Sequence, residues 1–216
     1  MSLALLIKDE LNGFYRSKVM AILFVGLPAI AVLMYILSPD LGGMPLGAFT
    51  ALLVSSTAGL LASTTLAVSI INERSQGAFD LFLVRPVKRS HLLLAKYLAV
   101  LTCVVLAAAL ALVLANGYDW YVSGTVDLGA LRGPMLVTLT MACLCSAAAV
   151  LFGSLVRSVL VGVILTLYGG NQLSAVVVLP ALENMFSLEA TAALGIGLSI
   201  VILGLATTIF NRRLSS

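Results

Sequence analysis

Charged and aromatic side chains gather in one stretch of this sequence, NERSQGAFDLFLVRPVKRSHLLLAK, which runs from Asn72 to Lys96. The chain as a whole is 61% hydrophobic and only 10% charged, so this stretch stands out from its surroundings. Acidic, basic and aromatic groups at this density suit recognition of a protein surface or of anionic lipid headgroups. The single histidine, His91, is accompanied by no H-E-x-x-H or G-x-S-x-G motif, so no catalytic residue is predicted.

Nucleotide and metal chemistry also lack their usual residues. There is no G-x-x-x-x-G-K-[ST] phosphate loop, so the chain is not expected to hydrolyse nucleotide itself. Cys103, Cys143 and Cys145 all fall within apolar runs, where we interpret them as small packing residues and expect neither a zinc site nor a disulfide. We therefore expect no cofactor or metal on this chain.

The elements that must position the charged stretch are membrane-spanning helices. A run of about 20 apolar residues can cross the hydrocarbon core as a helix, and helices are required there because lipid offers the backbone no hydrogen-bond partners. We therefore predict an all-α membrane protein with six transmembrane helices in a single domain over residues 1–216. The predicted spans are Val19 to Leu37, Leu46 to Ile71, Leu92 to Ala115, Pro134 to Leu155, Val159 to Pro180, and Ala190 to Phe210.

The distribution of lysine and arginine predicts the orientation of these spans. Short cytoplasmic loops carry the positive excess, and six spans with both termini in the cytoplasm leave only Arg132 outside. The net charge of +3 is then explained by topology and contact with anionic lipid, and it gives no indication of nucleic-acid binding. The eleven basic residues placed inside are Lys8, Arg16, Lys18, Arg74, Arg85, Lys88, Arg89, Lys96, Arg157, Arg212 and Arg213.

With Lys96 counted among the cytoplasmic residues, no ionisable side chain is expected inside a span. Proton-coupled carriers and voltage sensors need such groups despite their cost, so this expectation disfavours those classes. Sodium coupling through carbonyl and hydroxyl groups stays open.

Residues 1–17 are expected to form an interfacial amphipathic helix on the cytoplasmic surface. An extension of the first span is the alternative. The apolar side is predicted to carry Leu3, Ala4, Ile7, Leu11, Phe14 and Tyr15, and the polar side Lys8, Asp9, Asn12 and Arg16.

The second and fifth predicted spans carry small or polar residues, which could serve either in helix packing or in lining a translocation path. Small and hydroxylated residues in the second span, including Gly59 and Ala62, either pack against a neighbouring helix or line a translocation path. Gly169 and Gly170 in the fifth span predict a break, or even a re-entrant turn, that would expose backbone carbonyls to a path or to protein. The possible path-lining residues are Ser55, Ser63, Ser69, Tyr168, Asn171 and Gln172.

Three connections are predicted on the outer side, and none is long enough for a folded domain. The longest, Asn116 to Gly133, holds Tyr118, Trp120 and Tyr121, which suit a position at headgroup level.

The connection from residue 72 to residue 90 is longer than a turn between antiparallel helices needs. Its residues 77–84 predict a short helix with Phe79, Phe82 and Leu83 on one side, capped at its start by Ser75 and ended by Pro86. Such a helix suits insertion into a groove of a soluble partner. A simple positively charged loop is the alternative.

The segment INERSQGAFDLFLVRPVKRSHLLLAKYLA resembles the region after the second span in ABC exporter permeases of the second type. That family has an E-R pair, a G-(T/A)-x-(E/D)-x-L helix, R-P, basic residues and L-L-x-A-K entering the third span. Corresponding residues here are Glu73, Arg74, Gly77, Ala78, Asp80, Phe82, Leu83, Arg85, Pro86, Lys88, Arg89 and Leu93 to Lys96.

The resemblance implies a permease subunit in the inner membrane of a prokaryotic cell, which pairs with a second six-helix permease subunit and with ABC ATPase subunits. Residues 72–90, here named the coupling segment, would dock in the ATPase groove, with Glu73, Arg74, Gly77, Phe79, Asp80, Phe82, Leu83, Arg85 and Pro86 forming the contact. ATP and Mg²⁺ would bind to the ATPase partner. Substrate, and homodimer or heterodimer, stay open. The alternatives are a haem-exporter membrane subunit of cytochrome c maturation, and a stand-alone channel or sodium-coupled carrier.

Overall fold

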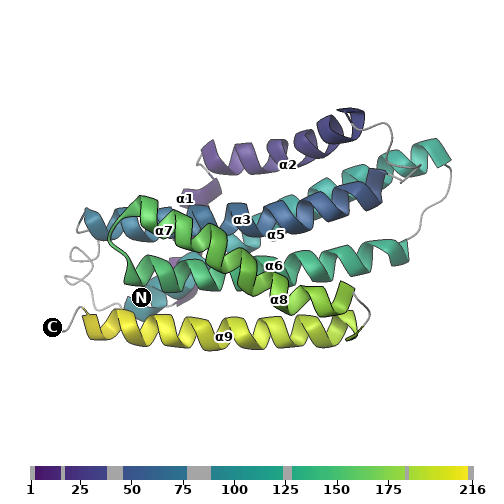
Figure 1. Cartoon of the computed structure of the whole chain (residues 1–216). Helices are drawn as coiled ribbons and strands as arrows, with labels where there is room; N and C mark the ends of the chain where they lie inside the picture. Colours follow the sequence, from purple (N-terminus) through teal and green to yellow (C-terminus); the bar gives the residue numbers. More distant parts are fainter. Residues whose placement is uncertain are drawn as a thin grey trace.

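The computed structural model describes residues 3–15, 18–37, 46–76, 89–123, 128–182 and 185–213, and the regular structure in these ranges is helical, without strands (Figure 1). The expectation of an all-α protein is thereby confirmed. The helices are α1 (Leu3–Tyr15), α2 (Lys18–Leu37), α3 (Leu46–Ser75), α5 (Arg89–Ser123), α6 (Leu128–Leu155), α7 (Val159–Leu165), the π-helix η2 (Thr166–Gly170), α8 (Asn171–Leu182) and α9 (Leu188–Arg213).

Five stretches of helix among the described residues are long and apolar enough to cross a membrane. They correspond to the second to sixth predicted spans. The first predicted span coincides with α2, a helix of 20 residues, and its crossing of the membrane stays a prediction, as does the cytoplasmic position of both termini. The five stretches are Leu53–Ser75, Ser90–Tyr121, Arg132–Leu155, Val159–Ala181 and Leu188–Phe210.

Helices α3 and α6 form the centre of the bundle, with α9 packed on the far side of α6 and α5 on α3 (Figure 1). Small residues allow the central pair to approach closely. A Cβ atom built on Gly59 in α3 would lie 3.2 Å from Cys145 Sγ, and one built on Gly153 in α6 would lie 3.2 Å from Ile70 Cγ2. The small-residue face of the second span is therefore used in helix packing.

The fifth span runs without a reversal from Val159 to Leu182, which differs from the predicted break or re-entrant turn. Its glycines lie in η2, where the widened π turn brings the backbone against α6: a Cβ on Gly169 would lie 3.0 Å from the Phe152 ring. The Gly170 carbonyl accepts hydrogen bonds from Ser174 Oγ at 2.8 Å and from Cys145 Sγ at 3.5 Å. Side chains thus satisfy a carbonyl at this turn and the helix continues.

The predicted outer connection Asn116 to Gly133 is also shorter than expected. Helix α5 continues past its apolar run to Ser123 and α6 already begins at Leu128. The extension has a role in the fold, because Asp119 Oδ1 accepts a hydrogen bond at 3.0 Å from the backbone N–H of Leu46, the first residue of α3. A carboxylate at this position satisfies one of the free N–H groups of the helix start.

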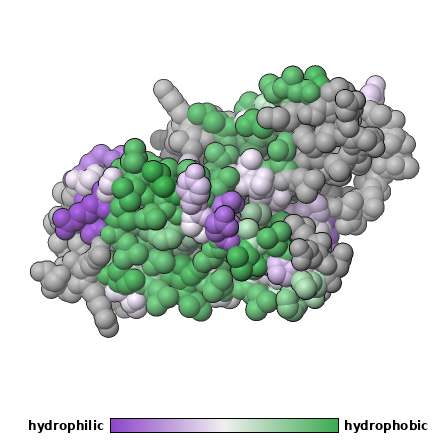
Figure 2. All heavy atoms as spheres, viewed as in Figure 1, coloured by the Kyte–Doolittle hydropathy of each residue, from purple (hydrophilic) through white to green (hydrophobic). Residues whose placement is uncertain are grey.

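The exterior of the bundle is largely hydrophobic. Figure 2 shows one face on which hydrophobic residues predominate, with hydrophilic residues at one end of the molecule and a smaller hydrophilic patch near the middle of the face. Large apolar side chains on this exterior include Leu160 at 68% and Val176 at 70% exposure. An extensive apolar surface of this kind suits lipid or another hydrophobic helix and is rare on proteins that work in water.

Candidate functional site

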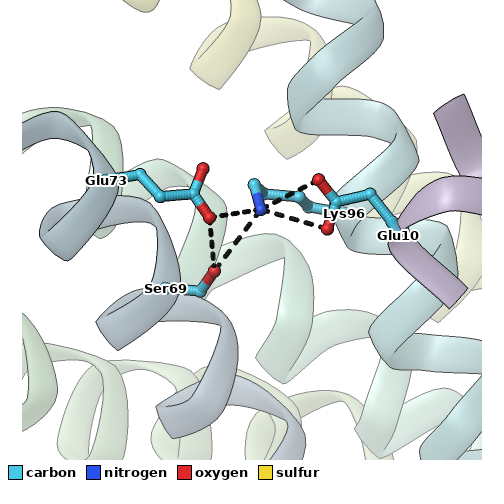
Figure 3. Close-up of polar contacts among 4 residues, drawn as sticks. All are labelled: Glu10, Ser69, Glu73 and Lys96. Atoms are coloured by element: carbon cyan, nitrogen blue, oxygen red, sulfur yellow. Dashed lines mark hydrogen bonds and ion pairs between the residues drawn. The ribbon is translucent and has the colours of Figure 1, made fainter. Parts of the chain in front are cut away.

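A cluster of charged side chains joins three helices at the end of the bundle where α3 ends and α5 begins (Figure 3). Lys96 of α5 points its ammonium group between two carboxylates. Its Nζ atom lies 2.5 Å from Glu73 Oε1 of α3 and 3.0 Å from Glu10 Oε1 of α1. Ser69, one turn before Glu73, donates its hydroxyl to Glu73 Oε1 at 3.1 Å. We call Glu10, Ser69, Glu73 and Lys96 the Lys96 cluster.

The cluster is largely withdrawn from solvent. The Lys96 side chain is 6% exposed, and those of Glu10 and Glu73 are 24% and 29% exposed. Burial of an ammonium group is costly unless charged and hydrogen-bonding partners surround it. Here the three N–H donors face Glu10 Oε2 at 3.1 Å, Glu73 Oε1 and Ser69 Oγ at 3.5 Å, so all of them have acceptors.

This cluster corrects the expectation that no ionisable group lies inside a span. Lys96 falls within the candidate span Ser90–Tyr121, and its burial shows that it is not simply a cytoplasmic loop residue. The lysine sits one to two turns inside α5, where Glu10 and Glu73 reach it from the neighbouring helices. A lysine inside a predicted apolar run was the signal that partners exist, since such residues are almost always paired.

Helix α1 is held against the bundle as well as being amphipathic. Leu6 is 6% exposed and packs in the hydrophobic core, with Ile7 and Leu11 partly buried beside it. Lys8 and Asp9 are exposed, as predicted for the polar side. Leu6 and Glu10 were missed in the sequence, although they lie four residues apart and therefore share a helix face that turns toward α5.

The neighbouring residue Arg74 secures the end of α3 on its other side. Its Nη1 donates a hydrogen bond of 2.8 Å to the carbonyl oxygen of Ser154, in the last turn of α6. A cation at this position suits the unpaired carbonyls and the negative dipole of a helix C-terminus. The adjacent residues Glu73 and Arg74 therefore attach α3 to α5 and α1 in one direction and to α6 in the other.

A comparison of the chain with protein families identifies the family to which it belongs. The family described as "ABC-2 family transporter protein" matches residues 6–172, which include all four residues of the Lys96 cluster. The chain belongs to the ABC-2 transporter family. A search of curated proteins found no match to this chain. The protein is thus a multi-pass membrane protein of the ABC-2 transporter family, whose members associate with ABC ATPases and whose membrane domains are typically non-catalytic.

The resemblance assigned nine residues of this ABC-2 protein to ATPase contact, and two of them are described. Glu73 and Arg74 both bind other helices of the same chain. Ser75, the predicted cap of the next helix, instead lies in α3 and donates its hydroxyl to the Asn72 carbonyl at 2.8 Å. The contact role of the remaining residues stays a prediction; Gly77, Phe79, Asp80, Phe82, Leu83, Arg85 and Pro86 lie outside the described residues.

The six possible path-lining residues of the ABC-2 protein do not share one surface in this conformation. Ser55 and Ser63 are buried on α3, and Ser69 belongs to the Lys96 cluster. Tyr168 is 72% exposed, Gln172 is exposed and Asn171 is half-buried, all on η2 and α8. The path-lining role of these residues stays a prediction.

Within the ranges that the structure describes, no group of three or more His, Cys, Asp or Glu side chains is arranged to hold a metal ion. The thiols of Cys103, Cys143 and Cys145 are all free and buried among the helices. The Lys96 cluster is a charged joint between α1, α3 and α5.

Proposed function

We propose that this ABC-2 protein is the permease subunit of an ATP-driven exporter in the inner membrane of a prokaryotic cell, and that its whole length forms one permease domain. The coupling segment, residues 72–90, would dock a separate ABC ATPase subunit, which binds ATP and Mg²⁺. Family membership supports the permease and its ATPase partner. The direction of transport, the docking segment and the compartment are parts of the proposal.

The observation that carries the docking proposal is the anchoring of α3 immediately before the coupling segment leaves it. Glu73 is joined to Lys96 and Arg74 to the Ser154 carbonyl, so the last turn of α3 is held from two sides. A push on the coupling segment would therefore be transmitted to α1, α5 and α6 as well as to α3.

The translocation path is proposed to lie between this subunit and a second six-helix permease subunit. The exposed apolar side chains of α7 and α8, together with Tyr168 and Gln172, provide a surface suited to lipid or to that second subunit. Ser55 and Ser63 would reach a path only if α3 and α6 separated, because both are buried within the bundle.

The proposal is tested by purifying the tagged full chain from its native membrane in a mild detergent and identifying the proteins that co-elute. We expect an ABC ATPase in stoichiometric amount and hydrolysis of ATP by the complex. The proposed permease function would be contradicted if the chain eluted without any ATPase although ABC ATPases are present in the same native membranes.

A further inference from the structure

We propose that Lys96, with Glu10 and Glu73, makes α1, the end of α3 and the beginning of α5 move as one body during the ATP cycle. These three side chains are positioning residues for force transmission and do not contact nucleotide. The inference rests on the proposed function, because it concerns the helices that flank the coupling segment. It extends that function by assigning the N-terminal helix a mechanical connection to both ends of the segment.

The geometry of the ammonium group supports a joint of three helices. Lys96 Nζ contacts both oxygen atoms of Glu10, at 3.0 and 3.1 Å, and one oxygen atom of Glu73, at 2.5 Å. The two carboxylates come from different helices and repel each other, and the shared cation offsets that repulsion. Without that cation, α1 would have no ionic attachment to α3 through this cluster.

Apolar packing attaches α1 to α5, beside the ion pair between Glu10 and Lys96, and leaves the relation of α1 to α3 weak. Leu6, Ile7 and Leu11 pack on the core beside α5, whereas α1 and α3 make few direct contacts. Because the interior around Lys96 is nearly closed to water, the ion pairs there are screened less than pairs on the surface. The Lys96 cluster is therefore the connection that would keep α1 in register with α3 when α3 is loaded.

The experiment measures the distance between α1 and α3 in the complete permease–ATPase complex. Nitroxide labels are placed on Asn12→Cys in α1 and Gln76→Cys after α3, both at exposed positions, with Cys103, Cys143 and Cys145 changed to Ala. Distances are recorded by electron paramagnetic resonance without nucleotide and after trapping with ATP and vanadate. With Lys96 present, we expect the same distance in both states.

In the Lys96→Met variant we expect trapping to shift or split that distance by more than about 2 Å, the upper range of helix shifts at interfaces. Glu10→Gln keeps the pair between Lys96 and Glu73 and weakens only the attachment of α1, so it should give the same shift in a protein that retains its fold. Lys96→Arg should restore the single distance. Arg132→Met is the matched control, since it removes a cation paired with Glu189 at the opposite end of the bundle.

A distance that stays unchanged on trapping in both Lys96→Met and Glu10→Gln would overturn the inference, and so would a large shift in the parent protein. Either result would leave the proposed function in place if the ATPase still co-purified. Failure of the parent chain to bind an ATPase is a separate outcome, which would count against the proposed function first.

Discussion

Lys96 Nζ lies 2.5 Å from Glu73 Oε1, and this ion pair joins the beginning of α5 to the end of α3 across the coupling segment. The helices α3 and α5, which flank the coupling segment in the sequence, are thus connected to each other inside the bundle. The same lysine also holds Glu10 of α1, at 3.0 Å. One buried cation therefore serves two carboxylates.

Removal of the cation should destabilise the protein more than removal of one anion. Lys96→Met leaves Glu10 and Glu73 facing each other unpaired, which we expect to cost about 3 kcal/mol, the lower end for a broken buried pair because both carboxylates keep some contact with water. Glu73→Gln leaves a balanced pair and should cost about 1 kcal/mol. Thermal unfolding in detergent measures the order of the two.

Arg132→Met is the control for this comparison. Arg132 and Glu189 are 73% and 69% exposed, and exposed ion pairs contribute about 0–1 kcal/mol. If Glu73→Gln lowered the unfolding temperature as much as Lys96→Met, the shared-cation description of the cluster would be wrong.

Two glycines in α9 should respond oppositely to alanine. A Cβ atom on Gly195 would collide with the γ-methyl group of Thr140 in α6, whereas nothing lies within 4 Å of one on Gly197. Thr140 is β-branched and its hydroxyl bonds to the Leu136 carbonyl, so it has little freedom to move away. We expect Gly195→Ala to destabilise by about 1–3 kcal/mol. Gly197→Ala should stabilise the helix by up to about 1 kcal/mol.

The unfolding temperatures of these two variants in the same detergent give the test. A stabilised Gly195→Ala protein would mean that α6 and α9 are further apart than the structure has them.

The native cysteines should resist thiol reagents in the folded protein. Cys103, Cys143 and Cys145 are each at most 6% exposed. A membrane-permeant maleimide should therefore label none of them in mild detergent and all three after denaturation in SDS, as counted by intact-mass spectrometry. Introduction of Lys8→Cys, at an exposed position, supplies the positive control. Rapid labelling of a native cysteine would contradict the packing of α5 or α6.

The proposed orientation predicts opposite labelling at the two ends of the bundle. Gln76 follows α3 at the end where α5 begins, and Tyr121, 86% exposed, lies in the last turn of α5. In a background without native cysteines, a membrane-impermeant maleimide added to intact cells with a permeabilised outer envelope should label Tyr121→Cys. Gln76→Cys should react only after the inner membrane is opened. The reverse pattern would place the coupling segment outside the cytoplasm.

Much of the helical architecture could be predicted because lipid imposes one requirement on every span. Apolar runs of sufficient length predicted α3, α5, α6 and α9. The observed helices differ from the predicted spans mainly by extra residues at their termini. The ends were missed because a helix continues where its hydrogen bonds are satisfied, whatever its hydropathy. Tyr118 and Trp120 lie on such an extension, which also carries Asp119 to the start of α3.

The charged joint was harder to predict because its members are far apart in the sequence. Glu10, Glu73 and Lys96 each fit a local explanation: a polar side of a surface helix, a docking contact and a basic residue at a loop. Only tertiary structure brings them together, and no local pattern indicates which carboxylate a buried lysine selects. Gly169 and Gly170 likewise suggested a break in the helix. In the structure they lie in a π turn that continues the helix and allows its backbone to approach α6 closely.

The most direct test of the proposed coupling is the co-purification of the ATPase with a permease whose coupling segment carries Phe82→Asp and Leu83→Asp. We expect this variant to insert into the membrane at the parent level and to lose the ATPase, because charged side chains would replace the apolar contact. Phe186→Asp, on a residue that is 56% exposed and outside the segment, is the control and should retain the ATPase. If the variant with Phe82→Asp and Leu83→Asp kept the ATPase in full, together with ATP hydrolysis by the complex, the docking of the ATPase on the coupling segment would be contradicted.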